Sequence, residues 1–258
     1  MDDNEVILSV QGLSKKFEGI TALEKIDIDV TSKSIHGLIG PNGAGKTTFF
    51  NLITRLRSAD EGKVLFKTID ISNYQPEKIA KLGVSRTFQA GKLVPNMTAL
   101  ENVMIGANCN TSLDLLGAFF HLPFTTSRQE RKTKNKAREL LNLVKMSNSE
   151  NRWAADLVWV ERQLIQIARA LAAEPRLILL DEPTGGMGEE ESFRVAELIK
   201  KLKNDIGMTA IIVGHDMNLV LGISDIVTCI DFGKKICEGV PEKVKKDIRV
   251  LEAYLGKD

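Results

Sequence analysis

A glycine-rich segment in the first fifth of this 258-residue chain constrains its fold more than any other feature. Residues 40–47 read Gly-Pro-Asn-Gly-Ala-Gly-Lys-Thr, which is a complete G-x-x-x-x-G-K-[ST] pattern. The apolar segment 34–39 before it predicts a buried strand, and the spacing in 48–56 after it predicts a helix. In that context, consecutive backbone N–H groups can turn inward around a polyphosphate. A helix that starts near Lys46 adds its positive dipole end.

The residue types in this segment predict separate roles for its polar groups. The Lys46 ammonium would reach the β- and γ-phosphates, and the Thr47 hydroxyl would ligate Mg²⁺. A glycine-rich turn that binds nothing is the alternative, but the strand and the helix around the segment disfavour it. The predicted phosphate-binding residues are Gly40, Pro41, Asn42, Gly43, Ala44, Gly45, Lys46, Thr47 and Thr48.

Composition and charge exclude several other classes of function. The formal net charge of +1 gives no overall attraction to nucleic acid, so we expect no nucleic-acid partner. No run of 18 apolar residues is present, and the acidic start of the chain does not resemble a secretion signal. The three cysteines, Cys109, Cys229 and Cys237, are scattered, which predicts small core residues in a reducing compartment such as the cytoplasm.

The order of elements along the chain predicts an α/β core with a helical insertion. Strand and helix signals alternate through the first 90 residues and again after about residue 160, which indicates a doubly wound sheet. Between them, Thr98-Ala-Leu-Glu101 is a capping-box signature, and 127–144 has the pattern of a long amphipathic helix. We therefore expect one domain over 1–258, with a core of 1–92 and 161–258 and a helical subdomain of 93–160.

Two adjacent acids follow a fully apolar segment in the second half of the chain. The segment 177–180 reads Leu-Ile-Leu-Leu and predicts a buried strand of a parallel sheet, with Asp181 and Glu182 directly after it. Ligands bind at this end of such strands. Asp181 can hold Mg²⁺, and Glu182 can accept a proton from an attacking water. A surface turn before Pro183 is the alternative, which the phosphate-binding pattern disfavours.

Three further side chains are weaker candidates. His215 follows the next buried strand, where it could bond the γ-phosphate and steady Glu182, although a single histidine is often structural. Gln89 stands at the junction between core and insertion, where its amide could contact both Mg²⁺ and the attacking water. Phe17 could stack on an adenine ring, and the alternative is an ordinary anchor for a loop.

These motifs, in this order, resemble the nucleotide-binding subunit of an ABC transporter over essentially the whole chain. The resemblance sharpens at Arg86-Thr-Phe-Gln89, Met97-Thr-Ala-Leu-Glu-Asn-Val103, Gly214-His-Asp-Met217 and Glu252-Ala-Tyr-Leu-Gly256. Together these segments are similar to the ATP-binding subunits of uptake systems for branched-chain amino acids, amides or urea. The resemblance implies a P-loop NTPase fold of the ABC ATPase type, with antiparallel strands at the N-terminal end beside the doubly wound sheet.

The resemblance also implies an activity and a set of partners. Such subunits bind ATP with Mg²⁺, and two of them enclose two ATP molecules head to tail. Closure of that pair drives transmembrane permease subunits, and hydrolysis reopens it. We therefore expect an ATPase at the cytoplasmic face of the cell membrane, held there as a peripheral subunit. Its partners would be the permease, a second ATPase subunit and, indirectly, a substrate-binding protein.

The chain departs from the family at two loops. The signature loop should read close to L-S-G-G-Q or L-S-Y-G-Q, but residues 157–161 read Leu-Val-Trp-Val-Glu. Val158 has no hydroxyl, Val160 resists positive φ, and Glu161 adds a negative charge at a helix start that should receive a phosphate. The loop 185–188, Gly-Gly-Met-Gly, also lacks the Asp or Asn that relatives carry there.

In this family the signature loop of one subunit completes the ATP site of the other. A poor signature in this chain would therefore impair the partner's site and leave its own intact. We expect a pair with a paralogous ATPase, although pairing with a second copy is open. The alternatives are a regulatory module that binds ATP with weak or no hydrolysis, and a soluble ABC ATPase that acts outside transport.

Overall fold

The computed structural model describes residues 5–87, 93–108 and 123–255, with the side chains of 108, 123–129 and 255 left aside. Within these ranges the chain divides into two compact units. The first combines residues up to Arg86 with those from Leu177 onward, and the second covers Thr87–Arg176. The second unit thus runs past residue 160, because the helix that begins at Trp159 packs against the other helices of that unit.

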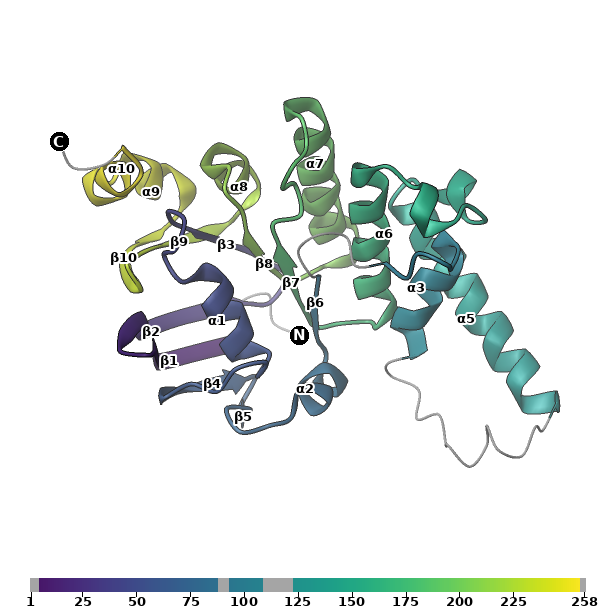
Figure 1. Cartoon of the computed structure of the whole chain (residues 1–258), viewed down its shortest axis with the longest axis horizontal. Helices are drawn as coiled ribbons and strands as arrows, with labels where there is room; N and C mark the ends of the chain where they lie inside the picture. Colours follow the sequence, from purple (N-terminus) through teal and green to yellow (C-terminus); the bar gives the residue numbers. More distant parts are fainter. Residues whose placement is uncertain (1–4, 88–92, 109–122, 256–258) are drawn as a thin grey trace. The chain divides into compact units, whose positions relative to one another are not determined.

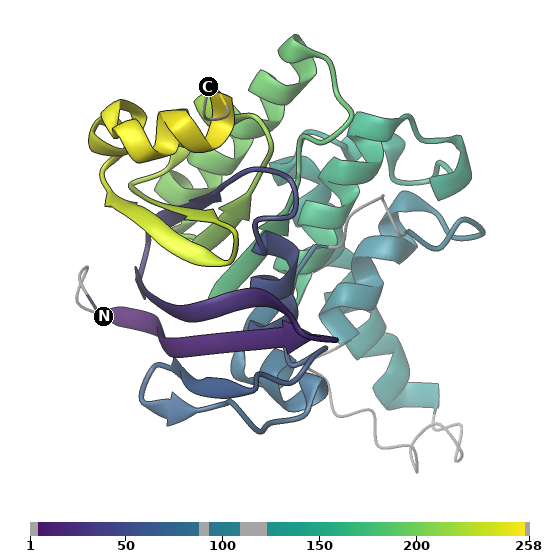
Figure 2. The same ribbon diagram turned by 60° about the vertical axis from the view of Figure 1, so that its left-hand side comes forward.

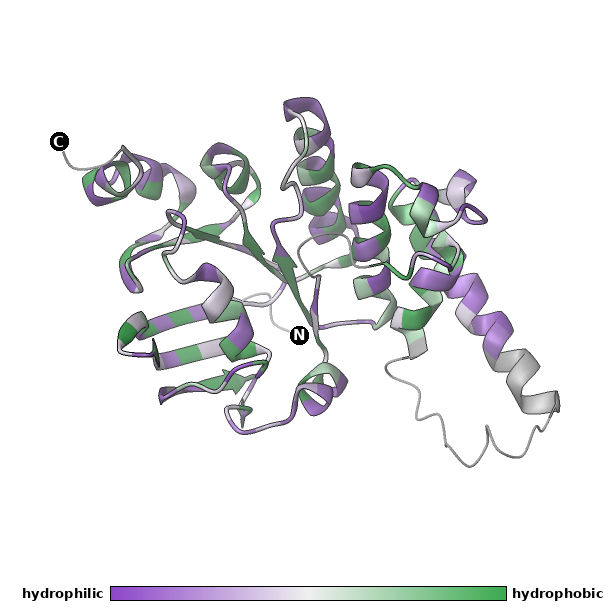
Figure 3. Cartoon of the chain, viewed as in Figure 1, coloured by the Kyte–Doolittle hydropathy of each residue, from purple (hydrophilic) through white to green (hydrophobic). Residues whose placement is uncertain are grey.

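A six-stranded sheet forms the centre of the first unit (Figure 1). Its strands are parallel except for one edge strand, which pairs antiparallel with its neighbour. Strands buried on both faces need continuous apolar sequence. In Figure 3, β8 is hydrophobic throughout, and β7 is hydrophobic up to its last residue, Asp181. Their order is β10 (Lys234–Gly239), β9 (Ile226–Asp231), β3 (Ile35–Ile39), β8 (Ala210–Val213), β7 (Leu177–Asp181) and β6 (Val84–Arg86).

A second, antiparallel sheet belongs to the same unit. Its order is β2 (Ile20–Thr31), β1 (Val6–Phe17), β4 (Glu61–Phe66) and β5 (Ile69–Asp70). Buried and exposed residues alternate in the second part of β2, from Ile26 to Val30, as expected where one face of a sheet packs on a core and the other meets solvent. The predicted α/β class with N-terminal antiparallel strands is confirmed.

Helix α1 (Lys46–Ile53) contributes to a core that includes strands of both sheets. Phe49 and Phe50 on this helix are almost fully buried, in one cluster with residues such as Leu8 and Leu38. Burying one such aromatic side chain stabilises the fold by roughly 1.5–3 kcal/mol. The other helices of the unit are α2 (Pro76–Leu82), α7 (Glu189–Ile206), α8 (Met217–Ile223), α9 (Pro241–Lys246) and α10 (Ile248–Leu255), and Figure 2 shows α9 and α10 beside the β9–β10 hairpin.

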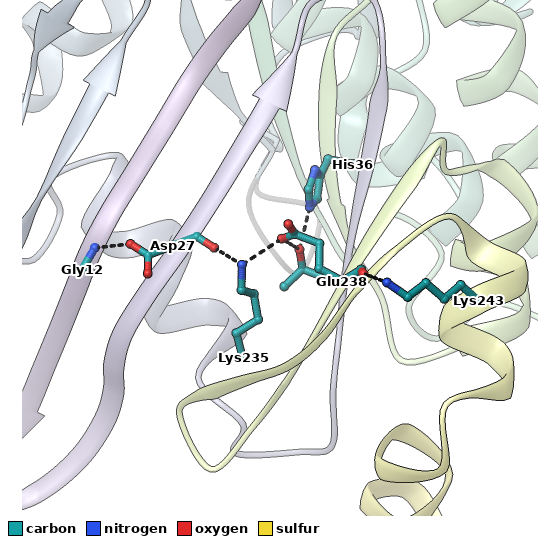
Figure 4. Close-up of polar contacts among 7 residues, drawn as sticks. Gly12, Asp27, His36, Lys235, Glu238 and Lys243 are labelled. Atoms are coloured by element: carbon teal, nitrogen blue, oxygen red, sulfur yellow. Dashed lines mark hydrogen bonds and ion pairs between the residues drawn. The ribbon is translucent and has the colours of Figure 1, made fainter.

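Polar bonds also connect the two sheets of this unit (Figure 4). The Lys235 ammonium on β10 donates to the Asp27 carbonyl on β2 at 2.7 Å and pairs with Glu238 at 3.4 Å. Thr228 on β9 donates to Glu238 at 2.7 Å, and its hydroxyl lies 2.8 Å from Nε2 of the buried His36 on β3. Burial lowers the pKa of His36 to about 4, so the imidazole is neutral at physiological pH.

The second unit is helical in the described residues. It holds α3 (Ala99–Asn108), α5 (Pro123–Leu143), α6 (Trp159–Ala172) and two short 3₁₀ turns, Ser147–Ser149 and Ala154–Asp156. The predicted capping box is present, because Glu101 N–H donates to the Thr98 hydroxyl at 3.2 Å and Thr98 N–H donates to the Glu101 carboxylate at 2.8 Å. No helix among the described residues is long and apolar enough to span a membrane.

Candidate active site

The glycine-rich segment 40–47, predicted to bind phosphate, lies between β3 and α1 in a conformation that requires its glycines. Gly40 has a φ of 152°, and a Cβ at this position would lie 2.0 Å from the carbonyl oxygen of Ile230. Gly45 has a φ of 106°, and a Cβ there would lie 2.5 Å from the carbonyl oxygen of Ala22. A larger residue would push this backbone away from its neighbours, so both glycines are needed for the shape of the loop.

Lys46, the first residue of α1, extends its ammonium into the loop itself. Nζ donates to the carbonyl oxygens of Gly40 at 2.6 Å and Pro41 at 2.9 Å, and the residue is buried. Burial lowers the pKa of Lys46, and the nearby Glu182 carboxylate opposes that shift. The first turn of α1 has no acidic residue, and its cap residue Gly45 supplies no side-chain bond. The N–H groups and positive end of this helix therefore remain available to an anion.

A cavity of about 300 Å³ opens in front of this loop. The loop residues share it with the side chains of two distant strand ends, Glu182 after β7 and His215 after β8. It is lined by Ala22, Asn42, Gly43, Ala44, Gly45, Lys46, Thr47, Thr48, Glu182 and His215. A cavity with backbone N–H groups, an ammonium and a hydroxyl on one side suits a polyphosphate.

Glu182 and His215 are in direct contact across adjacent parallel strands. Glu182 Oε1 lies 2.6 Å from His215 Nε2, and Glu182 N–H donates to the Val213 carbonyl at 2.9 Å. The φ of Glu182 is 49°, an uncommon value for a residue with a side chain, and such backbone strain occurs often at functional sites. Because the side chain of Glu182 is 15% exposed, the carboxylate can meet a water that enters the cavity.

Asp181 is bonded to a residue that sequence reasoning did not select. Arg86, at the end of β6, donates through Nη2 to Asp181 Oδ2 at 2.7 Å, and both side chains are almost fully buried. Nη1 of Arg86 also donates to Asn51 on α1 at 2.8 Å. A signal for this pair was present, since Arg86 ends a strand just as Asp181 does, but the neighbouring position of β6 and β7 was needed to see it.

Two of the predicted site residues, Thr47 and Asp181, carry oxygen donors that suit a hard cation of the magnesium type. The described residues contain no group of three or more His, Cys, Asp or Glu side chains that could hold a metal ion by themselves. Mg²⁺ usually keeps several waters and takes one or two protein oxygens together with the phosphates of its nucleotide. The Thr47 hydroxyl and the Asp181 carboxylate would supply such oxygens, so this chain and a nucleotide could hold the ion jointly.

Two residues that the sequence predicted for the site are not placed in the cavity described above. Phe17 is not among its lining residues, and Gln89 is not described by the structure. Phe17 ends β1, is 40% exposed, and has the Lys15 ammonium 5.3 Å from the centre of its ring. Its proposed stacking on adenine stays a prediction. Gln89 lies outside the described residues, so its expected contacts with Mg²⁺ and water also stay predictions.

A second cavity of about 380 Å³ adjoins Glu182 and His215. Its other lining residues are Thr184, Gly185, Gly186, Met187, Glu189, Ser192, Gly214 and Asp216. The Asp216 carboxylate accepts from Leu219 N–H at 3.1 Å and so caps α8. Glu182 and His215 therefore face both cavities.

In the second unit, the signature positions form the start of α6. Val158 is the cap residue and is 59% exposed, and it offers no side-chain oxygen. Glu161 accepts from Val158 N–H at 3.0 Å and pairs with Arg152 at 2.6 Å. The expected negative charge at this helix start is therefore present, and Arg152 pairs with it within the same unit.

Comparison with known proteins identifies the class that this fold and site define. Residues 23–185 match the model of the ABC transporter family. The chain therefore belongs to the ABC transporter family, and it is an ABC ATPase that uses ATP and Mg²⁺.

Relatives and solved structures of this class match nearly the full chain. It is 35% identical to the high-affinity branched-chain amino acid transport ATP-binding protein BraF of Pseudomonas aeruginosa, over 97% of this chain and 98% of that protein. It is 32% identical to LivG of Escherichia coli, a protein of the same description, over 98% and 99%. An ATP-binding cassette of an ABC transporter in its ADP conformation superposes with a TM-score of 0.84 at 32% identity, covering 98% of this chain and 99% of the other.

Proposed function

We propose that this chain is the ATP-hydrolysing subunit of an importer for a small amino acid or amide, of the kind taken up by branched-chain amino-acid systems. The cavity that joins the loop 42–48 to Glu182 and His215 supports this most strongly, because it puts phosphate donors beside a carboxylate and an imidazole. The names of BraF and LivG support the substrate class.

The side chains divide the chemistry of hydrolysis among them. The loop and Lys46 would bind the phosphates, and Thr47 and Asp181 would hold Mg²⁺, which neutralises charge on the phosphates when bound. Glu182 would accept the proton of the attacking water, as a general base must lie within hydrogen-bond reach of that water. His215, already 2.6 Å from Glu182, would hold the carboxylate in place and bond the γ-phosphate.

Replacement of Lys46 by alanine tests the site. Loss of a charged hydrogen-bond donor costs roughly 1.5–3 kcal/mol, so we expect the Kd for Mg-ATP to rise about ten- to a hundredfold in calorimetry. Lys200→Ala, which removes an exposed ammonium from α7, is the matched control and should bind as the unmodified chain does. Unchanged binding by folded Lys46→Ala would refute the assigned site.

The proposed partners follow from the start of α6. A subunit with valines at 158 and 160 would complete its partner's ATP site poorly, so we propose pairing with a paralogous ATPase whose own signature completes the site of this chain. The pair would act on permease subunits at the cytoplasmic face of the cell membrane, fed by a substrate-binding protein. Co-purification of a second ATPase with the permease supports this, whereas a hydrolytically active homodimer contradicts it.

A regulatory module that binds ATP without productive hydrolysis is the second candidate. The exposed Val158 favours it, since that position lacks a hydroxyl for a partner's γ-phosphate. The contact between Glu182 and His215 favours hydrolysis instead. Single-turnover hydrolysis by the assembled complex separates the two, because a regulatory module would bind ATP and release it unchanged.

A further inference from the structure

A tyrosine on helix α10 is hydrogen-bonded to Gly40, the first residue of the proposed phosphate-binding loop. The backbone N–H of Gly40 donates to the hydroxyl oxygen of Tyr254 at 2.8 Å, across 214 positions of sequence. Tyr254 lies on α10 and is partly buried. A side-chain oxygen thus accepts the hydrogen bond of the residue where β3 ends and the loop begins.

Gly40 is held at three points, and Tyr254 is the most distant of them in sequence. Its Cα lies against β9, where a Cβ would collide with the Ile230 carbonyl, and its own carbonyl accepts from Lys46 Nζ at 2.6 Å. The tyrosine hydroxyl satisfies the remaining backbone group. On the proposed function the Lys46 ammonium turns toward phosphate when nucleotide binds, and the bond to Tyr254 can then persist after the bond to Lys46 is lost.

Helix α10 is itself fixed at its first turn. Asp247, just before the helix, pairs with the Arg249 guanidinium at 2.6 Å and accepts from Arg249 N–H at 3.0 Å. The buried Cys237 thiol on β10 also bonds the Asp247 carboxylate, and Val250 is fully buried. The tyrosine is therefore presented from an anchored helix.

The Tyr254 hydroxyl keeps its proton over the whole physiological range. Burial raises the pKa of Tyr254 to about 12, and the bond from Gly40 opposes that rise. A neutral phenol accepts one hydrogen bond without placing negative charge beside a phosphate site. This suits a group that supports the loop without competing with the nucleotide.

We infer that Tyr254 is a positioning residue, whose hydroxyl holds Gly40 so that the loop 40–47 keeps its nucleotide-binding shape when Lys46 leaves the Gly40 carbonyl. The inference rests on the proposed assignment of this loop as the ATP site. It predicts that removing one oxygen from α10 weakens nucleotide binding, although Tyr254 is not among the residues that line the cavity.

Tyr254→Phe in the full chain tests the inference, because it removes the hydroxyl and keeps the ring. A neutral hydrogen bond contributes roughly 0.5–1.5 kcal/mol, so the Kd for Mg-ATP should rise about three- to tenfold. The Gly40 amide should also exchange faster with deuterium in NMR measurements. Tyr74→Phe removes the hydroxyl of a tyrosine outside the loop and is the matched control, with binding expected to be unchanged.

A purely structural role for the ring gives a different result. In that case Tyr254→Phe leaves the Kd unchanged, whatever happens to the melting temperature, and the inference is overturned. Should Tyr254→Phe not fold, Asp247→Asn loosens the same helix without touching the tyrosine, and an unchanged Kd in that variant overturns the inference equally. Lys46→Ala is measured in parallel. If Lys46→Ala loses Mg-ATP binding but Tyr254→Phe does not, only this inference is rejected. If neither variant loses binding, the proposed ATP site is rejected as well.

Discussion

The N-terminal ends of α1 and α6 both present backbone N–H groups and a positive dipole end, but different groups surround them. At α1, a glycine caps the helix without a side-chain bond, the first turn holds no acid, and the N–H groups remain available to an anion. At α6, the Glu161 carboxylate accepts the Val158 N–H at 3.0 Å and is itself paired with Arg152. The first start is prepared for a phosphate, and the second already holds a negative group of its own chain.

This difference shows why a helix start alone does not define a site. Both helices have the positive end of their dipole at this position. Of the two, only α1 adds an ammonium, a hydroxyl and a cavity of about 300 Å³. At α6 the cap residue and the first helical residue are apolar and exposed, Val158 at 59% and Trp159 at 37%. On the function proposed above, the polar groups at α1 would serve this chain's own site, and α6 would contribute little to the site of a partner.

The largest effect should follow from Glu182→Gln, which leaves the α1 start intact and removes the base. Loss of a general base lowers rates about 10²- to 10⁴-fold, so ATP turnover of the assembled complex should collapse while Mg-ATP binding survives. Glu191→Gln, in the exposed first turn of α7, is the matched control. If turnover persists, and the equivalent change in the partner abolishes it, then the competent site belongs to the partner.

His36 lies on β3, the strand that precedes α1, and it should make the free energy of unfolding depend on pH. The pKa of His36 falls from 6.5 to about 4 on folding, so between these values the unfolded chain binds more protons than the folded one. The part of the free energy of unfolding that depends on neutral His36 is fully present above pH 6.5. It is lost as the pH falls toward 4, and the total loss is about 3 kcal/mol.

Urea unfolding at several pH values measures this dependence. The chain with His36→Gln should lose correspondingly less stability between pH 6.5 and 4, after subtraction of the difference between the two proteins at pH 8. Parallel pH curves for the two proteins would show that His36 does not carry the effect.

A smaller effect should follow from rebuilding the α6 start as Val158→Ser with Val160→Gly. The hydroxyl could then bond a charged phosphate, a contact of roughly 1.5 kcal/mol, so turnover at the partner's site should rise about tenfold. The measurement is made with Glu182→Gln in this chain, which silences its own site. Val94→Ser, at another exposed valine of the same unit, is the control. No gain would mean that the valines are not what limits that site.

Much of the fold was predictable because its signals are local. Four apolar residues followed by Asp181 and Glu182 predicted β7 and its end, and the glycine pattern predicted the turn into α1. The proximity of Glu182 and His215 was also predictable, since neighbouring parallel strands end at the same edge of a sheet. The roles of these residues in catalysis remain predictions.

Contacts between distant elements were beyond the reach of the sequence. The bond from Gly40 to Tyr254 depends on how α10 packs beside β10, and the pair of Arg86 and Asp181 depends on which strand neighbours β7. The Arg152 partner of Glu161 lies in a loop without a regular pattern. The extent of the helical unit to residue 176 likewise follows from how α6 packs, which its amphipathic pattern does not specify.

If Asp181 holds Mg²⁺ as proposed, the Arg86 guanidinium 2.7 Å from it affects the order in which metal and nucleotide bind. A divalent ion that arrives alone meets a carboxylate whose charge is already balanced, and so it gains little attraction there. A triphosphate brings several negative charges at once and restores that attraction. Mg²⁺ and the nucleotide should then bind together, and free Mg²⁺ in the cell would not bind to the nucleotide-free chain.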